Sequence, residues 1–332
     1  MKVLITGASG RIGGMLAAHL HHEGHHVRGL DIVPPPTPDI LDDVVVGGLL
    51  NLDTLNSALD DVDAIVHLAA VMSWHPHENQ RLFEVNVTGI YQLLSAARSR
   101  GISRFVFASS GEVYPELNPQ AHPITEAHPT MPNSPYGMTK RLGEEMVRTM
   151  CTQAGLPYTV LRFAHTQIAD ELFNPNSFFS GPRFYVNAKI RQFESLPQSP
   201  AVTETLERLR AVATEAEQHY ISRSEDGTPF RMGMCDARDM CHGIALALTE
   251  DAAVNETFNI GPLASFNFDR AVEHLASHTG LPVVNVRLTT THYNYDTSVE
   301  KAVRMLGYRP QYDIFRMIDD AASRVGTGVT DR

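Results

Sequence analysis

The sequence of 332 residues is poor in cysteine and has no paired cysteine motif. Its three cysteines, Cys151, Cys235 and Cys241, are odd in number and widely spaced, and none belongs to a Cys-x-x-Cys. This pattern excludes a disulfide scaffold and a cysteine-ligated zinc site. Free thiols are typical of a reducing compartment, so a cytoplasmic location is expected.

Basic runs and long hydrophobic runs are also missing. Lys and Arg number 27 against 38 Asp and Glu, which gives a formal net charge of −11. A nucleic-acid or anionic-membrane surface needs clustered cations, so neither partner is expected. No apolar stretch approaches transmembrane length, and residues 1–5 run into a strand pattern rather than a signal peptide. A small anionic substrate is compatible with this net charge, because it needs only one or two local cations.

Short apolar runs alternate with helical patterns such as Arg11–His22. The runs are Val3–Thr6, His26–Asp31, Asp63–Leu68, Arg104–Ala108 and Tyr158–Phe163. Runs that are apolar on both faces and separated by helices are typical of parallel strands covered on both sides. They predict an α/β fold, a Rossmann-like doubly wound parallel sheet.

The stretch from Ala164 to Arg231 departs from this alternation. Within it, Ser199 and Pro200 suit the N-cap and first position of an amphipathic helix. Its apolar residues recur at helical spacing: Val202, Leu206, Leu209 and Val212. We expect a lid or packing helix rather than a partner-binding helix.

A glycine-rich loop, Thr6–Gly13, follows the first strand and opens the first helix. Gly7 permits a tight turn, Gly10 lets the backbone approach a pyrophosphate, and Gly13 allows close packing of helix on strand. The helix N-terminus adds free N–H groups and a partial positive charge. The loop therefore predicts a dinucleotide site.

Asp31 ends the second strand, where a carboxylate accepts the adenosine ribose hydroxyls and repels a 2′-phosphate. This favours NAD over NADP. Arg11 and Arg28 lie nearby in the sequence, so NADP stays open as an alternative.

Tyr136 and Lys140 are four residues apart, on one face of a helix expected to begin near Ser134 and Pro135. A neighbouring cation favours the phenolate, which can take a proton from a substrate hydroxyl while hydride leaves its carbon. Ser110 follows the strand Arg104–Ala108 and can hydrogen-bond the reacting oxygen. Glu112 is a candidate second acid or base.

With these motifs the chain resembles an extended short-chain dehydrogenase/reductase of the NAD-dependent epimerase/dehydratase family. The matching stretches are Thr6–Gly13, Val66–Ala70, Asn86–Gly89, Ser109–Tyr114, Ser134–Lys140, Leu161–Phe163, Asp236–Asp239, Phe258–Gly261 and Leu306–Pro310. The resemblance implies a Rossmann domain for NAD, a smaller substrate region and usually a homodimer. We expect the Rossmann domain in residues 1–163 with 232–262, and the substrate-binding region in residues 164–231 and 263–325.

The resemblance also implies site residues. Ser110, Tyr136 and Lys140 would be catalytic, with Asn86 in support. The expected cofactor contacts are Gly7, Ser9, Gly10, Arg11, Ile12, Gly13, Asp31, Leu49, Leu68, Ala69, Ala70, Asn86, Ser109, Tyr136, Lys140 and Phe163. The expected substrate contacts are Ser110, Glu112, His165 and Arg231.

Two departures from the family pattern concern the substrate. Gly111 stands where sugar 4,6-dehydratases carry an acid, and Ala164–Gln167 replace the Asn and the Tyr-Gly-Pro-like turn that hold a sugar diphosphate. Arg183 is a further cation that can bind a carboxylate or phosphate, although a solvated charge is the more common role.

The histidine-rich segment from His19 to His26 is interpreted as a polar helix end, so no metal is expected. Our leading hypothesis is an NAD-dependent sugar or sugar-nucleotide epimerase/dehydratase-type enzyme, with an isomerase or lyase outcome. The alternative is a dehydrogenase of a free sugar or sugar acid. A non-catalytic NAD(P)-sensing protein is the third possibility.

Overall fold

A seven-stranded parallel sheet forms the centre of the computed structural model, which describes residues 1–116, 118–288 and 294–327. The strand order is β11-β6-β5-β4-β1-β2-β3. The strands are β1 (Lys2–Thr6), β2 (His26–Asp31), β3 (Asp43–Val46), β4 (Ala64–His67), β5 (Arg104–Ser110), β6 (Tyr158–Phe163) and β11 (Glu256–Ile260). The strand order reverses direction between β1 and β4, since the strands after β1 are added on one side of it and those from β4 on are added on the other. Ligands bind beside such a switch point.

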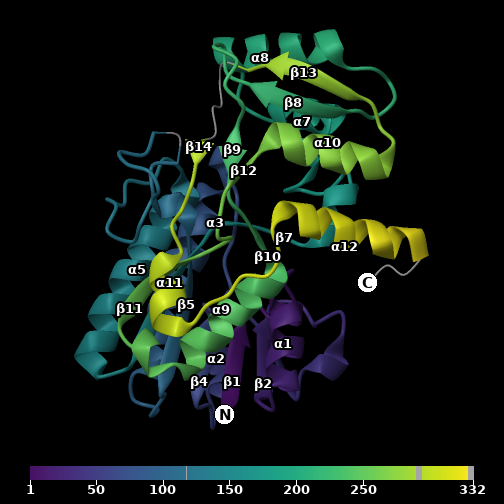
Figure 1. The fold of residues 1–332 in the computed structure, drawn as a ribbon. Helices are drawn as coiled ribbons and strands as arrows, with labels where there is room; N and C mark the ends of the chain where they lie inside the picture. Colours follow the sequence, from purple (N-terminus) through teal and green to yellow (C-terminus); the bar gives the residue numbers. More distant parts are fainter. Residues whose placement is uncertain (117, 289–293, 328–332) are drawn as a thin grey trace.

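Helices cover both faces of this sheet (Figure 1). On one face lie α1 (Gly13–His22), α9 (Ala237–Thr249) and α11 (Glu300–Leu306). On the other lie α2 (Leu52–Ala58), α4 (Ile90–Ala97) and α5 (Pro135–Ala154). Along β5, Val106 and Ala108 belong to the first core while Phe105 and Phe107 belong to the second. The predicted doubly wound α/β fold is confirmed.

Local sequence signals account for two of the helix starts. The Ser134 hydroxyl accepts a hydrogen bond from the backbone N of Gly137 at 2.9 Å, and α5 begins at the next residue, Pro135. Ser199 caps α8 (Pro200–Val212) in the same way, as predicted. Both prolines occupy a helix position whose N–H needs no intrahelical partner.

A second, smaller region carries its own hydrophobic core, above the sheet in Figure 1. Its helical elements are η5 (Ala169–Phe173), α6 (Gly181–Phe184), α7 (Val186–Glu194), α8, α10 (Phe268–Thr279) and α12 (Ile314–Thr327). Its strands are β7 (His165–Gln167), β8 (His219–Arg223), β9 (Arg231–Met232), β10 (Met234–Asp236), β12 (Phe266–Asn267), β13 (Val283–Arg287) and β14 (Asn294–Tyr295). Residues 289–293, part of the predicted segment 263–325, lie outside the described residues.

The apolar side of α8 is used for packing within the chain. Val202 and Leu206 form a small core with Phe193 of α7, and Leu209 joins the main core of this region. This agrees with the packing interpretation of the sequence pattern. None of the helices in the described ranges combines the length and apolar composition that a membrane crossing requires.

Candidate active site

The loop between β1 and α1 has no space for a side chain at two of its glycines. Gly7 adopts a φ of +77°, and a Cβ on it would lie 2.8 Å from the backbone N of Ala69. A Cβ on Gly13 would lie 2.2 Å from the carbonyl O of Gly7 and 2.6 Å from Cα of Ala8. A loop backbone that carries no side chains at these positions, next to a helix N-terminus, fits a dinucleotide pyrophosphate.

Asp31 ends β2 and is fixed against this loop. Its Oδ2 accepts a hydrogen bond from the backbone N of Ser9 at 3.0 Å, and its Oδ1 accepts one from the backbone N of Val33 at 3.3 Å. The Ser9 hydroxyl in turn donates to the carbonyl O of Val33 at 2.8 Å. The carboxylate thus lies at the carboxyl end of its strand, as the sequence predicted for a ribose contact.

Arg11 and Arg28, the two cations that kept NADP as an alternative cofactor, both form ion pairs with carboxylates of this chain. Arg28 lies three residues before Asp31 on β2 and donates to Oδ2 of Asp43, the first residue of β3, at 3.0 Å. Arg11 forms a two-point ion pair with Glu171 of η5, with Nε 2.7 Å from Oε1, and its guanidinium lies 4.4 Å from the ring centre of Phe179. The glycine loop is thereby tied to the smaller region.

Asn86 supports the chain that follows β4. It lies on a π-helical turn, η3 (Glu84–Gly89). Its amide exchanges two hydrogen bonds of 2.8 Å with the backbone of Val71 and donates a third to Thr139 of α5 at 3.1 Å. The predicted supporting residue therefore joins the end of β4 to the helix that carries Tyr136.

Tyr136 and Lys140 are buried on α5, beside the end of β5. Burial raises the pKa of the Tyr136 phenol, the charge of Glu112 raises it further, and hydrogen bonding with Ser110 opposes both. The Lys140 ammonium donates to the carbonyl O of Ala108 at 2.8 Å and lies 5.7 Å from the ring centre of Tyr136. Burial lowers the pKa of Lys140 to about 8.

Ser109, one of the predicted cofactor contacts, has its hydroxyl engaged elsewhere. It donates to Glu144 Oε1 at 2.6 Å, in a buried network beneath α5. Arg162 completes this network with hydrogen bonds of 2.8 and 2.7 Å to the two oxygens of Glu144. Only Ser110 of the serine pair presents its hydroxyl to Tyr136.

The other predicted cofactor residues lie around the same edge of the sheet. Gly10 donates its backbone N–H to Gly7 O at 3.1 Å, within the loop. Ile12 directly precedes α1, Leu68, Ala69 and Ala70 follow β4, and Phe163 ends β6. Leu49 is buried beside Gly89.

Glu112, whose charge acts on Tyr136, is held by two donors. Its Oε2 accepts hydrogen bonds from the Ser134 hydroxyl and, at 3.3 Å, from the indole N–H of Trp74. The Trp74 ring lies 6.5 Å from Tyr136 and stacks on Phe178 at 5.8 Å. Burial raises the pKa of Glu112.

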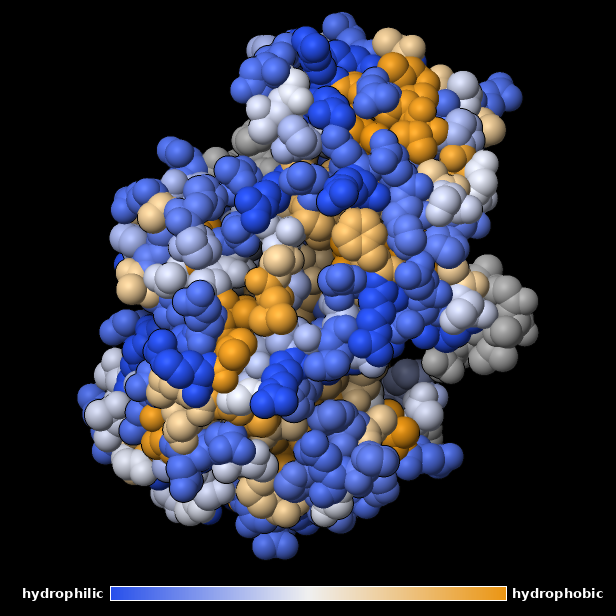
Figure 2. Space-filling view, in the orientation of Figure 1, coloured by the Kyte–Doolittle hydropathy of each residue, from blue (hydrophilic) through white to orange (hydrophobic). Residues whose placement is uncertain are grey.

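Figure 2 shows hydrophobic side chains between the part that carries the sheet and the smaller region above it.

A second carboxyl group, Glu116, lies close enough to Glu112 to interact with its charge. Burial, followed by the charge of Glu112, raises the pKa of Glu116 to about 8. His165 faces it, with Nε2 3.4 Å from Glu116 Oε1. Arg183 donates to His165 Nδ1 at 3.0 Å, which assigns the imidazole proton to Nε2, and among the described residues this buried nitrogen has no hydrogen-bond partner. The predicted residue His165 is therefore part of a buried acid–base cluster.

Glu116 and Tyr295 were missed by sequence reasoning. The ring of Tyr295 packs edge-on against His165, with centres 5.7 Å apart. A Cβ on Gly111 would lie 2.2 Å from the Tyr295 hydroxyl, so the space of the acid expected there is filled by Tyr295. Gly111 was the single sequence signal that another side chain fills this space, and it did not identify that side chain as Tyr295.

Arg231, the favoured substrate arginine, is engaged on the surface of β9. Its side chain is 45% exposed, pairs with Asp296 Oδ2 at 3.1 Å, and also donates to the hydroxyl of Ser265. Arg183, given less weight from the sequence, is the arginine that joins the cluster around Glu116.

The histidine-rich end of α1 pairs with neighbouring acids. His19 lies 3.3 Å from Glu23, and His26 lies 3.1 Å from Asp43. These contacts agree with a polar helix end.

Comparison with known proteins gives one family match and full-length relatives. The model of the NAD dependent epimerase/dehydratase family matches residues 3–261. The crystal structure of a short-chain dehydrogenase/reductase superfamily protein from Agrobacterium tumefaciens, with bound NAD, superposes with a TM-score of 0.91 at 41% identity. That similarity covers 99% of this chain and 98% of the other.

Two sugar-nucleotide epimerases are similar in sequence. A UDP-glucose 4-epimerase of Halalkalibacterium halodurans is 27% identical over 331 residues, which are 94% of this chain and 91% of that protein. An uncharacterised UDP-glucose epimerase of Bacillus subtilis is 37% identical over 180 residues, or 49% of this chain. The matched part spans 56% of that relative's length.

Proposed function

Because the chain belongs to the NAD-dependent epimerase/dehydratase family, we propose that it binds NAD and converts a sugar or sugar-nucleotide by transient oxidation of a hydroxyl group, with Tyr136 as the base. The observation that carries this proposal is the position of Ser110, Tyr136 and Lys140. All three lie where β5 ends and α5 begins, at the edge of the sheet that also carries the glycine loop. Open α/β sheets bind their ligands at this edge.

The residues present fit the cofactor. The backbone at Gly7, Gly10 and Gly13 would hold the pyrophosphate, and Asp31 would accept the hydroxyls of the adenosine ribose. When bound, NAD supplies a hydride acceptor that can return the hydride later in the cycle. NAD is favoured over NADP because Asp31 repels a 2′-phosphate and because the nearby Arg11 already binds Glu171.

Tyr136 would take the proton of the substrate hydroxyl. Its buried phenol keeps its own proton unless positive charge is close by, since burial raises its pKa. The Lys140 ammonium, anchored on the carbonyl of Ala108, supplies such a charge and is mostly protonated at neutral pH. Ser110 would hydrogen-bond the oxygen from which the proton leaves.

The carboxyl pair Glu112 and Glu116 favours an isomerase or lyase outcome over simple oxidation. Burial raises the pKa of both groups, and the two charges repel, so the pair retains a proton at neutral pH. A carboxyl group of this kind can add or remove a proton at the carbon next to a transient ketone. Plain dehydrogenation needs no such group besides Tyr136.

The experiment combines two readouts on one reaction. The purified protein with NAD is offered panels of nucleotide-sugars, free sugars and sugar acids, and NADH absorbance and product mass are followed together. We expect a converted substrate without net NADH, and loss of turnover but retained NAD binding in Tyr136→Phe. An unchanged rate in that variant would refute the proposal.

A dehydrogenase of a free sugar acid is the second candidate. Arg183 favours it, because this arginine lies close enough to Glu112 and Glu116 to lower their pKa values. A cation at that position suits a substrate carboxylate. NADH that accumulates in proportion to an oxidised product would decide for this candidate.

Further proposals concern assembly and organisation. We propose a homodimer through α4 and α5, since Tyr91, Met138 and Leu142 are exposed there to 55%, 46% and 39%. We propose that residues 164–231 and 263–325 form the substrate-binding region, because they supply His165, Arg183 and Tyr295. The three free cysteines support a cytoplasmic location.

A further inference from the structure

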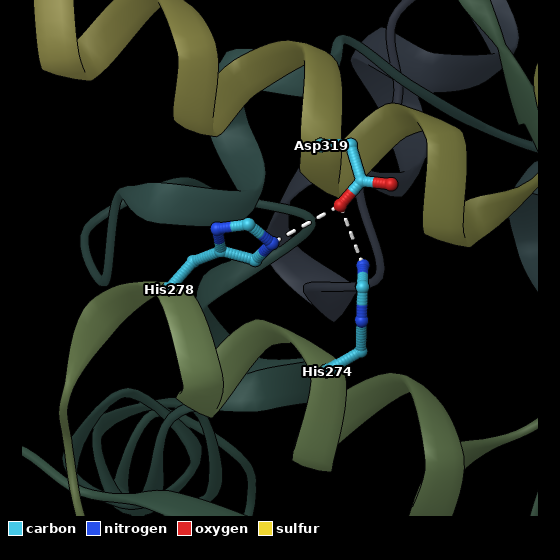
Figure 3. Close-up of side chains that lie close together, drawn as sticks. All are labelled: His274, His278 and Asp319. Carbon is cyan, nitrogen blue, oxygen red and sulfur yellow. Dashed lines mark hydrogen bonds and ion pairs between the residues drawn. The ribbon is translucent and has the colours of Figure 1, made fainter.

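Two histidines and one aspartate converge at the edge of the smaller region (Figure 3). His274 and His278 lie one turn apart on α10, and Asp319 lies on α12. Behind them the two helices share one hydrophobic core, to which Leu275 and Ile318 contribute. The backbones that carry the three side chains are therefore fixed by packing.

Both imidazoles point at the same carboxylate oxygen. Nε2 of His274 lies 2.7 Å and Nε2 of His278 lies 3.0 Å from Asp319 Oδ1. One donor atom from each of the three residues lies within 4.8 Å of the others. A tetrahedral ion about 2.1 Å from each ligand holds its ligand atoms about 3.4 Å apart. The two histidine–aspartate pairs thus need to open by less than about 1 Å, and the two imidazole nitrogens, which lie within 4.8 Å of each other, need to close by at most about 1.4 Å.

We propose that His274, His278 and Asp319 form a binding site for a divalent transition-metal ion of the zinc class, which joins α12 to α10. Two imidazole nitrogens and one carboxylate oxygen are the ligands that such ions prefer. Water would complete the coordination. The site is separate from Tyr136 and independent of the function proposed for it.

Access and surroundings suit an ion taken up from solution. The side chains of His274, His278 and Asp319 are exposed to 32%, 33% and 55%, so the ion reaches them without opening the core. The ring of His274 packs edge-on against Phe315 at 5.5 Å. This contact limits the rotation of the ring and keeps Nε2 directed at α12.

Calorimetric titration of the chelator-stripped, untagged full-length protein with Zn²⁺ alone tests the proposal. We expect one equivalent to bind at this site, and a rise in Tm of roughly 2 °C or more at saturation. His278→Gln and Asp319→Asn should each weaken this binding about tenfold or more and abolish the rise in Tm. Their circular dichroism and NAD binding should match those of the wild type.

His22→Gln is the matched control, because this exposed histidine belongs to the histidine-rich end of α1. It should bind Zn²⁺ as the wild type does. Equal losses in His22→Gln and His278→Gln would show binding spread over many histidines and overturn the proposal. Wild-type affinity in both His278→Gln and Asp319→Asn, or no binding to the wild type, would overturn it as well.

Discussion

Replacing Gly13 with alanine should disturb the cofactor loop more than any neighbouring change of the same size. The added Cβ would meet Gly7 O at 2.2 Å and Ala8 Cα at 2.6 Å, both of them backbone atoms that cannot rotate away. A carbon–oxygen contact needs about 3.2 Å, so helix and loop must separate by about 1 Å. We expect the free energy of unfolding to fall by about 1–3 kcal/mol, net of the small gain in helix propensity. NAD affinity should fall at least roughly tenfold.

Gly14→Ala is the control, one residue further along α1. Among the described residues outside its own helix, a Cβ there would contact only the side chain of Ile40, at an ordinary 3.6 Å. This variant should gain about 0.5–1 kcal/mol from helix propensity and keep its NAD affinity. Urea denaturation and titration with NAD, monitored by calorimetry, measure both quantities. If Gly13→Ala were as stable as Gly14→Ala and bound NAD equally well, the packing argument for this loop would be wrong.

Three further predictions concern other parts of the molecule. Glu144→Gln leaves Arg162 buried without its carboxylate, so denaturant titration should show a loss of about 3–5 kcal/mol. Burial raises the folded-state pKa of Glu116 to about 8 from 4.5, so the folded protein keeps a proton there that the unfolded chain releases. Between pH 4.5 and 8 the wild type should therefore lose stability relative to Glu116→Gln as pH rises, and parallel Tm profiles would contradict this. Leu142→Glu should yield a folded monomer by light scattering, and an unchanged dimer would rule out the face at α4 and α5.

Sequence reasoning succeeded where both partners of an interaction lie in one local element. The glycine loop and the helix that carries Tyr136 and Lys140 are encoded within a few consecutive residues, and so are the caps at Ser134 and Ser199. The parallel sheet followed from apolar runs of strand length. In each case spacing along the chain determines spacing in the structure.

It could not find partners that the fold brings together from distant segments. Arg11 and Glu171 are separated by 160 positions, and no local pattern marks them as an ion pair. Glu116 follows η4 (Gly111–Val113) and meets His165, the first residue of β7, only because the fold brings these two segments together. Ser109 is a different case, since strand alternation places it with Phe105 and Phe107 beneath α5.

The ion pair between Arg11 and Glu171 connects the proposed cofactor loop to the proposed substrate-binding region. Asp170, the neighbour of Glu171 in η5, binds Arg324 of α12 at 2.8 Å, so this short segment is held from both sides. A cofactor that moves Arg11 changes the free energy of its ion pair with Glu171. A substrate that moves η5 changes the free energy of the same ion pair. Each ligand must then alter the affinity of the other by one common factor. Glu171→Gln should bring that factor close to one, whichever ligand is titrated first.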